Sequence, residues 1–137
     1  MELVSNSTDL AVIVDYAHTP DALEKALQAL RLHCEGKLWV VFGCGGDRDT
    51  GKRPAMGAIA VKYADQVIVT SDNPRTESPH QIIDQIIQNI KGQCSIESDL
   101  RAAINHAVLH ATPGDVVLIA GHGYENYQIL GADRLAF

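Results

Sequence analysis

The sequence has little of what would place a protein in a membrane or on nucleic acid. Among its 137 residues, no apolar run approaches the roughly 18 that a membrane span needs. No N-terminal stretch has the anatomy of a signal peptide. Lys and Arg number 11 against 17 Asp and Glu, a net charge of −6, whereas a binder of phosphate backbones needs a clustered basic face. We therefore expect neither a membrane nor a nucleic-acid partner.

Cysteine is also scarce. The three cysteines, Cys34, Cys44 and Cys94, are odd in number and widely spaced. This pattern fits a reducing cytoplasm better than a disulfide framework. No C-x-x-C spacing accompanies Cys44 and the nearby His18 to indicate a metal site, and no acid–base partner is apparent for a nucleophilic thiol. We expect a cytoplasmic protein with no metal site in this chain.

What the sequence does contain is a set of short, continuous apolar runs. With 46% apolar and 20% charged residues, the chain has the composition of one globular domain with a single core. Runs of this kind are typical of strands buried on both faces of a parallel sheet. They occupy residues 10–14, 38–42, 67–70 and 116–120, with a weaker candidate at 94–97.

Helical patterns lie between these runs, and most have explicit start signals. Thr19-Pro20 and Ser78-Pro79 each place a capping residue before a proline, Arg53-Pro54 precedes a third apolar stripe, and Asp99 can cap residues 100–110. The alternation predicts an α/β fold: a three-layer αβα, Rossmann-like domain with a mostly parallel sheet of about six strands. We expect one domain over residues 1–137. Because neither end carries a cap or a polar tail, we expect it to be part of a longer protein.

Polar residues gather in the loops that follow the predicted strands, namely 15–20, 43–53, 71–75 and 121–127. In a doubly wound sheet, ligands bind outside the carboxyl ends of the strands. Four loops with carboxylates, two arginines, an amide and glycines therefore converge on one predicted site.

The glycine-rich loop nearly matches a phosphate-binding P-loop. It reads Gly46-x4-Gly51-Lys52-Arg53, but Arg53 replaces the hydroxyl residue that would hold Mg²⁺, and Pro54 follows at once. The pattern favours a turn that presents Arg48 to an anionic ligand. Glycines needed only for a tight turn are the alternative.

Asp72-Asn73-Pro74-Arg75 is either a plain turn or a ligand site. Asp and Asn-Pro form turns, whereas Arg75 offers a bidentate clamp for a carboxylate beside an amide. His18 can cap a helix, contact a phosphate or face solvent. Gly121-x-Gly123 lacks the third glycine of a dinucleotide site, because Asn126 stands there.

Taken together, these loops resemble the C-terminal domain of the Mur ligases, and specifically the branch that adds meso-diaminopimelate. The resemblance covers nearly the whole chain and depends on four segments: 15–22, 42–49, 72–75 and Gly121-x-Gly123-x-Glu125-x-Tyr127-Gln128. The third segment is the most specific. One departure is that His122 and Tyr124 stand where the family usually has lysine and histidine.

The resemblance implies an ATP-dependent amide ligase of cytoplasmic peptidoglycan synthesis. ATP would phosphorylate the D-glutamyl carboxylate of UDP-N-acetylmuramoyl-L-alanyl-D-glutamate, and the amine of meso-diaminopimelate would displace phosphate. In the family an N-terminal domain holds the UDP-sugar, and a central domain holds most of ATP and Mg²⁺. Neither domain is in this chain, so we expect the chain alone to be inactive and to hold no catalytic residue.

The resemblance also implies two groups of binding residues. Those for meso-diaminopimelate are Arg48, Asp72, Asn73, Pro74, Arg75, Gly121 and Glu125, and those that meet the nucleotide when the domain closes are Asp15, Tyr16 and His18. Arg48 and Arg75 would clamp the carboxylates of the amino acid. Lysine lacks the distal carboxylate, so it would leave Arg75 unpaired at a cost of roughly a few kcal/mol.

Three other functions are compatible with parts of the sequence. The chain could belong to a ligase for lysine or another diamine, although residues 72–75 argue against that. It could be an independent phosphotransferase that uses residues 46–53. It could also be a non-catalytic, Rossmann-type module that binds a small ligand.

Overall fold

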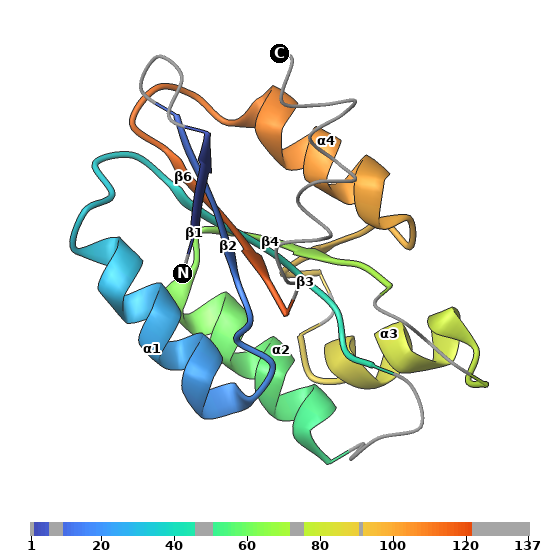
Figure 1. Ribbon diagram of the computed structural model, residues 1–137. Coiled ribbons are helices and arrows are strands. Elements are labelled where there is room, and N and C mark those ends of the chain that lie inside the picture. Colours follow the sequence, from blue (N-terminus) through green and yellow to red (C-terminus); the bar gives the residue numbers. More distant parts are fainter. Residues whose placement is uncertain (1, 6–9, 46–50, 72–75, 91, 122–137) are drawn as a thin grey trace.

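The chain alternates strands and helices, as the apolar pattern predicts (Figure 1). The computed structural model describes residues 2–5, 10–45, 51–71, 76–90 and 92–121. Its strands are β1 (Glu2–Ser5), β2 (Ala11–Asp15), β3 (Leu38–Phe42), β4 (Gln66–Val69), β5 (Ser95–Ile96) and β6 (Val116–Ala120). Its helices are α1 (Pro20–Arg31), α2 (Lys52–Tyr63), α3 (Pro79–Ile87) and α4 (Leu100–His110). No helix in this described part is long and apolar enough to cross a membrane.

The strands form one six-stranded sheet in the order β1-β2-β6-β3-β4-β5. All neighbours pair in parallel except β1, which runs antiparallel to β2 at the edge. Strand β6 is the last described strand in the sequence, yet it lies between β2 and β3 in the sheet. Its residue Val117 is therefore opposite both Val12 and Trp39. The prediction of a mostly parallel sheet of about six strands is confirmed.

Helices cover both faces of the sheet and complete the three predicted layers. Helices α1, α2 and α3 pack on one face, and α4 packs on the other (Figure 1). Strand β3 shows the division, because Val40 and Phe42 enter the larger core whereas Trp39 and Val41 face α4. All five residues of β3 are buried, which is why its sequence shows no polar alternation.

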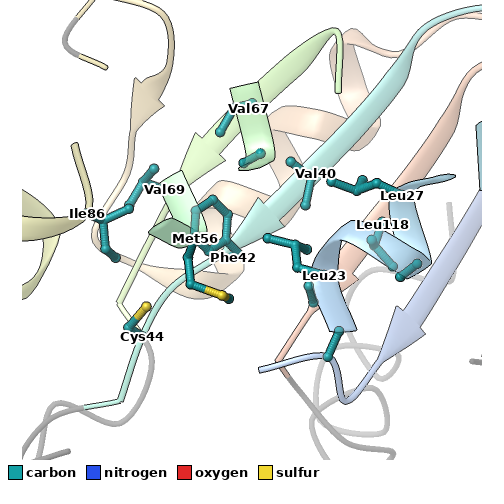
Figure 2. Packing of buried hydrophobic residues seen from close by; sticks show 14 of the residues in the cluster. Leu23, Leu27, Val40, Phe42, Cys44, Met56, Val67, Val69, Ile86 and Leu118 are labelled. Atoms are coloured by element: carbon teal, nitrogen blue, oxygen red, sulfur yellow. The ribbon is translucent and has the colours of Figure 1, made fainter. Parts of the chain in front are cut away.

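The larger core ends directly beneath the loop that follows β3. Figure 2 shows Phe42 and Met56 packed between the strands and helices, with Cys44 at the end of the cluster. Cys44 is only 3% exposed. Packing therefore fixes the first part of this loop before its glycine-rich part begins.

Two helix starts follow the predicted capping chemistry closely. The Thr19 hydroxyl accepts a hydrogen bond from the Ala22 amide at 3.2 Å, and the Asp99 carboxylate accepts one from the Ala102 amide at 2.9 Å. Pro79 opens α3 as predicted, but the side chain of Ser78 makes no capping hydrogen bond.

The structure differs from the sequence prediction at two further places. Strand β1 was not predicted as an element, because a short edge strand shows no continuous apolar run. Helix α2 begins at Lys52, one residue before the predicted Arg53-Pro54 start. A proline is tolerated at this place because the first-turn N–H groups of a helix have no partner within the helix.

Candidate functional site

The carboxyl ends of β2 and β6 meet at the predicted site. The Gly121 amide donates a hydrogen bond to the Asp15 carbonyl oxygen at 2.8 Å, which joins the ends of the two strands. Gly121 has φ +86°, in the left-handed region that a residue with a side chain adopts only with strain. The glycine is thus required by the turn, and its backbone lies beside the Asp15 loop.

The loop after β2 carries the three residues predicted to meet a nucleotide. The Asp15 carboxylate accepts a hydrogen bond from the Ala17 amide at 3.1 Å, and the His18 ring nitrogen Nδ1 lies 2.8 Å from the Tyr16 carbonyl oxygen. Lys52 Nζ donates to the His18 carbonyl oxygen at 2.8 Å, which ties the loop to the start of α2. Tyr16 is 62% exposed. The loop therefore presents Tyr16 and His18 outward from a fixed backbone.

Most of the residues predicted to bind the amino acid lie outside the described part of the chain. They are Arg48, Asp72, Asn73, Pro74, Arg75 and Glu125. His122 and Tyr124, which differ from the residues that the family usually has, lie outside it as well. The described residues beside them are informative. Strands β3 and β4 are neighbours, with Phe42 opposite Val69, and the Thr70 amide donates to the Phe42 carbonyl oxygen at 2.9 Å. The chain therefore leaves β3 and β4 at the same end of two adjacent parallel strands, before segments 46–50 and 72–75.

Arg53 connects the flanks of these two segments, and the sequence analysis missed this role. Its Nη1 and Nη2 donate to the two carboxylate oxygens of Glu77 at 3.0 and 2.8 Å. Nη1 also donates to Gln85 Oε1 at 2.8 Å, and Nη2 to the Gly45 carbonyl oxygen at 2.9 Å. Arg53 is fully buried.

The partners of Arg53 lie 8, 24 and 32 residues away in sequence, so no local pattern could have revealed them. The only cue was a charged residue in the first turn of an otherwise apolar-faced helix. The same contacts weaken the P-loop alternative. The residue at the hydroxyl position is held by protein groups instead of facing a phosphate.

The described residues contain no group of three His, Cys, Asp or Glu side chains that could hold a metal ion. His106 and His110 do stand four residues apart on α4. Their rings stack with centroids 4.2 Å apart, and His110 Nδ1 lies 2.8 Å from the His106 carbonyl oxygen. Both are exposed on the helix that covers the other face of the sheet.

A hollow of about 450 Å³ lies at the opposite edge of the sheet, where β2 and β6 begin. Asp115 lines it and is buried. Its carboxylate accepts hydrogen bonds from the Lys37 amide at 2.8 Å, the Trp39 indole at 3.0 Å and the Thr112 amide at 3.0 Å. Burial by itself would raise the pKa of Asp115, but these donors outweigh it and hold the pKa below its ordinary value. Asp115 is therefore an internal anchor whose oxygens already have partners.

Comparison with known proteins agrees with the geometry. Residues 1–123 match the profile of the family described as Mur ligase, glutamate ligase domain. The chain is 58% identical over 131 residues to the UDP-N-acetylmuramoyl-L-alanyl-D-glutamate–2,6-diaminopimelate ligase of Thermosynechococcus vestitus, which covers 94% of this chain and 26% of that protein. The chain thus spans about a quarter of the length of this curated relative.

Solved structures give the same result. The chain is similar to a structure of UDP-N-acetylmuramoyl-L-alanyl-D-glutamate–2,6-diaminopimelate ligase with a TM-score of 0.85 and 48% identity, over 92% of this chain and 26% of that one. It also shares its fold with a domain from a putative UDP-N-acetylmuramate:L-alanyl-gamma-D-glutamyl-diaminopimelate ligase of Haemophilus ducreyi. That match has a TM-score of 0.70 and 19% identity, over 98% of this chain and 96% of that one.

Proposed function

We propose that this chain, which belongs to the Mur ligase family, is the C-terminal domain of a meso-diaminopimelate-adding ligase. The observation that carries the proposal is the 58% identity to a relative whose name specifies both the acceptor and 2,6-diaminopimelate. Residues 1–137 form the single amino-acid-binding domain, and an N-terminal UDP-binding domain and a central ATPase domain complete the parent protein. The enzyme acts in the cytoplasm, in peptidoglycan synthesis.

The reaction divides between the domains as follows. ATP transfers its γ-phosphoryl group to the D-glutamyl carboxylate of UDP-N-acetylmuramoyl-L-alanyl-D-glutamate. The amine of meso-diaminopimelate then attacks the acyl phosphate, phosphate leaves, and an amide bond forms. ATP and Mg²⁺ are held mainly by the central domain. This chain binds and orients the amino acid, so the isolated chain does not catalyse the reaction.

The amino-acid site lies at the carboxyl edge of the sheet. Arg48 and Arg75 pair with the two carboxylates, and Asp72, Asn73, Glu125 and the Gly121 carbonyl bind the ammonium groups. Pro74 is assigned to the site as part of the same Asp72–Arg75 motif. Two features support this placement: Gly121 lies beside the end of β2, and Arg53 joins the residues that flank the two arginine-bearing segments. On closure Asp15, Tyr16 and His18 contact the nucleotide.

A chimeric enzyme tests the proposal. This chain replaces the matched quarter of the T. vestitus ligase, and phosphate release is followed with ATP, Mg²⁺ and the UDP-muramoyl dipeptide. We expect phosphate release with meso-diaminopimelate. With L-lysine, kcat/KM should be roughly 100-fold lower, because leaving Arg75 unpaired costs a few kcal/mol, which corresponds to such a factor. Arg75→Ala is expected to raise KM for meso-diaminopimelate by a similar factor and to remove most of the discrimination.

Arg31→Ala is the matched control, because it removes a guanidinium at the opposite edge of the sheet, where Arg31 pairs with Asp65 at 3.0 Å. This variant should keep the discrimination intact. Equal turnover of lysine by the unmutated chimera would contradict the proposed substrate. Full ATP hydrolysis by the 137-residue chain alone would favour the phosphotransferase alternative.

A further inference from the structure

Arg53 is a buried charged residue whose guanidinium group makes several hydrogen bonds to protein groups. Its two terminal nitrogens make four hydrogen bonds to Gly45, Glu77 and Gln85, and the residue has no exposed surface. Desolvating an ion pair costs about as much as the pair returns, and apolar side chains of similar size often fill such a site equally well. Net stability therefore gives little reason for a guanidinium here, and the geometry that it imposes becomes the more informative property.

The contacts of Arg53 lie at the boundaries of two loops. Gly45 immediately precedes residues 46–50, and Glu77 is the second residue after 72–75. The two loops leave neighbouring parallel strands, which fix where each loop begins. Arg53 ties the exit of β3 to the far side of the next loop. Gln85 adds α3 to the same connection.

The shape of the guanidinium makes this connection rigid. A planar fork paired with both oxygens of a carboxylate fixes the distance and the plane of the partner, whereas an ammonium group is a point charge. Cys44, which directly precedes Gly45 in the sequence, belongs to the same buried core cluster as Met56 (Figure 2). Glu77 is thus held relative to the core of the domain through Arg53.

We infer that Arg53 is a positioning residue for amino-acid recognition: by pairing with Glu77 and Gly45, it fixes the residues that flank segments 46–50 and 72–75, the segments to which Arg48 and Arg75 belong. This inference rests on the proposed function. It adds that affinity for the diamino acid depends on a buried residue that does not touch the substrate. The inference also states that recognition of the amino acid requires the planar, two-pronged guanidinium group of Arg53 and not merely its positive charge.

The test uses the chimeric ligase with Arg53→Lys, Arg53→Met and Glu77→Gln. We expect Arg53→Lys and Glu77→Gln to raise KM for meso-diaminopimelate at least 10-fold and to lower its preference over L-lysine. The KM values for ATP and for the UDP-muramoyl dipeptide should change less than 3-fold. Arg53→Met removes all four hydrogen bonds and should show the largest effect. If Arg53→Met does not fold, the other two variants still provide the test.

Two controls separate positioning from general destabilisation. Asp115→Asn disturbs a buried, hydrogen-bonded charge at the opposite edge of the sheet and should lower the thermal midpoint without raising KM for meso-diaminopimelate. Combining Arg53→Lys with Arg75→Ala should raise this KM by much less than the product of the two single effects, because Arg53 acts through the Arg75 loop.

Three results would overturn the inference: a change in all three KM values together, an unchanged KM for meso-diaminopimelate in folded Arg53→Lys, or the same KM increase in Asp115→Asn. These results are distinct from failure of the proposed function. If the unmutated chimera requires meso-diaminopimelate and Arg53→Lys leaves its KM unchanged, only the role of Arg53 is wrong. If phosphate release by the unmutated chimera does not depend on meso-diaminopimelate, both the proposed function and the role of Arg53 are wrong.

Discussion

At the scale of single residues, the domain satisfies its buried charges in two different ways. Arg53 is paired with an opposite charge, Glu77, at 2.8 Å. Asp115 is held by neutral N–H donors from the backbone and from the Trp39 indole. The first arrangement spans two loops at the candidate site. The second joins residues 37–39 to residues 112–115 at the amino ends of the strands, opposite the candidate site.

The hydrogen bonds of Asp115 predict an acid-sensitive contribution to stability. Because its folded-state pKa is lowered, the contribution is complete above the unfolded-state pKa of about 4 and is lost as pH falls through the folded-state pKa. Asp115→Asn turns an amide NH₂ toward N–H donors. It should lower the free energy of unfolding by roughly 2 kcal/mol at pH 7 and by less at pH 3.

Urea unfolding of the 137-residue chain at both pH values measures this difference. The chain is suited to the measurement because it builds its own core on each face of the sheet. Asp21→Asn, in an exposed pair with Lys25 on α1, is the control and should change little. A loss of the same size at pH 7 and pH 3 would show that the Asp115 contacts do not depend on its charge.

At the scale of elements, the contact between α2 and α3 depends on one residue without a side chain. A Cβ atom at Gly57 would collide with the Ile86 carbonyl oxygen, and it would lie 3.1 Å from Ile90 Cδ1. Helix α3 therefore lies closer to α2 at this point than any other residue would permit. Gln85, a partner of Arg53, belongs to the same helix.

Gly57→Ala should destabilise the domain by about 1–3 kcal/mol, although alanine is the better helix former by about 1 kcal/mol. The collision involves backbone, which cannot rotate away as a flexible side chain does. Ala58→Gly on the exposed face of α2 is the companion variant, and it should cost about 1 kcal/mol through backbone entropy alone. Thermal unfolding of both variants checks the pair. A neutral or stabilising Gly57→Ala would mean that α3 moves aside freely.

Elements with a local cause could be predicted from the sequence, whereas those with a distant cause could not. Thr19 and Asp99 mark helix starts because each caps an amide only three positions away. The apolar run of β6 predicts a buried strand, since both of its faces are covered. Strand β1 depends on pairing with β2, and Arg53 on partners up to 32 residues away. The placement of Arg48 and Arg75 remains a prediction from motif and resemblance.

At the scale of the whole molecule, the central position of β6 makes the domain depend on its final described strand. Strand β6 pairs with β2 on one side and with β3 on the other, so without it the sheet is divided into two parts. Strand β1, by contrast, pairs only with β2 within the described residues. Loss of β6 should therefore affect the stability of the sheet more than loss of β1, although both strands lie near the ends of the described chain.

Two truncations compare these positions. A chain that stops after Pro113 should not unfold cooperatively in urea, because it lacks the strand that joins β2 to β3 and that is one of the two neighbouring strands of each. A chain that begins at Leu10 lacks only β1 and should retain a cooperative transition with a lower midpoint. Far-UV circular dichroism follows both. A cooperative transition in the first chain would show that β2 and β3 can pair directly.

Because β6 is the last described strand in the sequence, the sheet cannot be completed until late in protein synthesis. Roughly 100 residues separate the end of β2 from the start of β6, which a ribosome adds in roughly 5–20 s at 5–20 residues per second. Throughout that interval β2 lacks its neighbour β6, and β3 lacks the same neighbour from the moment Phe42 has been added. The apolar core that α1 shares with β6 remains incomplete. Until Ala120 has been added, the new chain therefore exposes unpaired strand edges and apolar surface, the features that make incomplete chains prone to aggregate, whatever the stability of the finished fold.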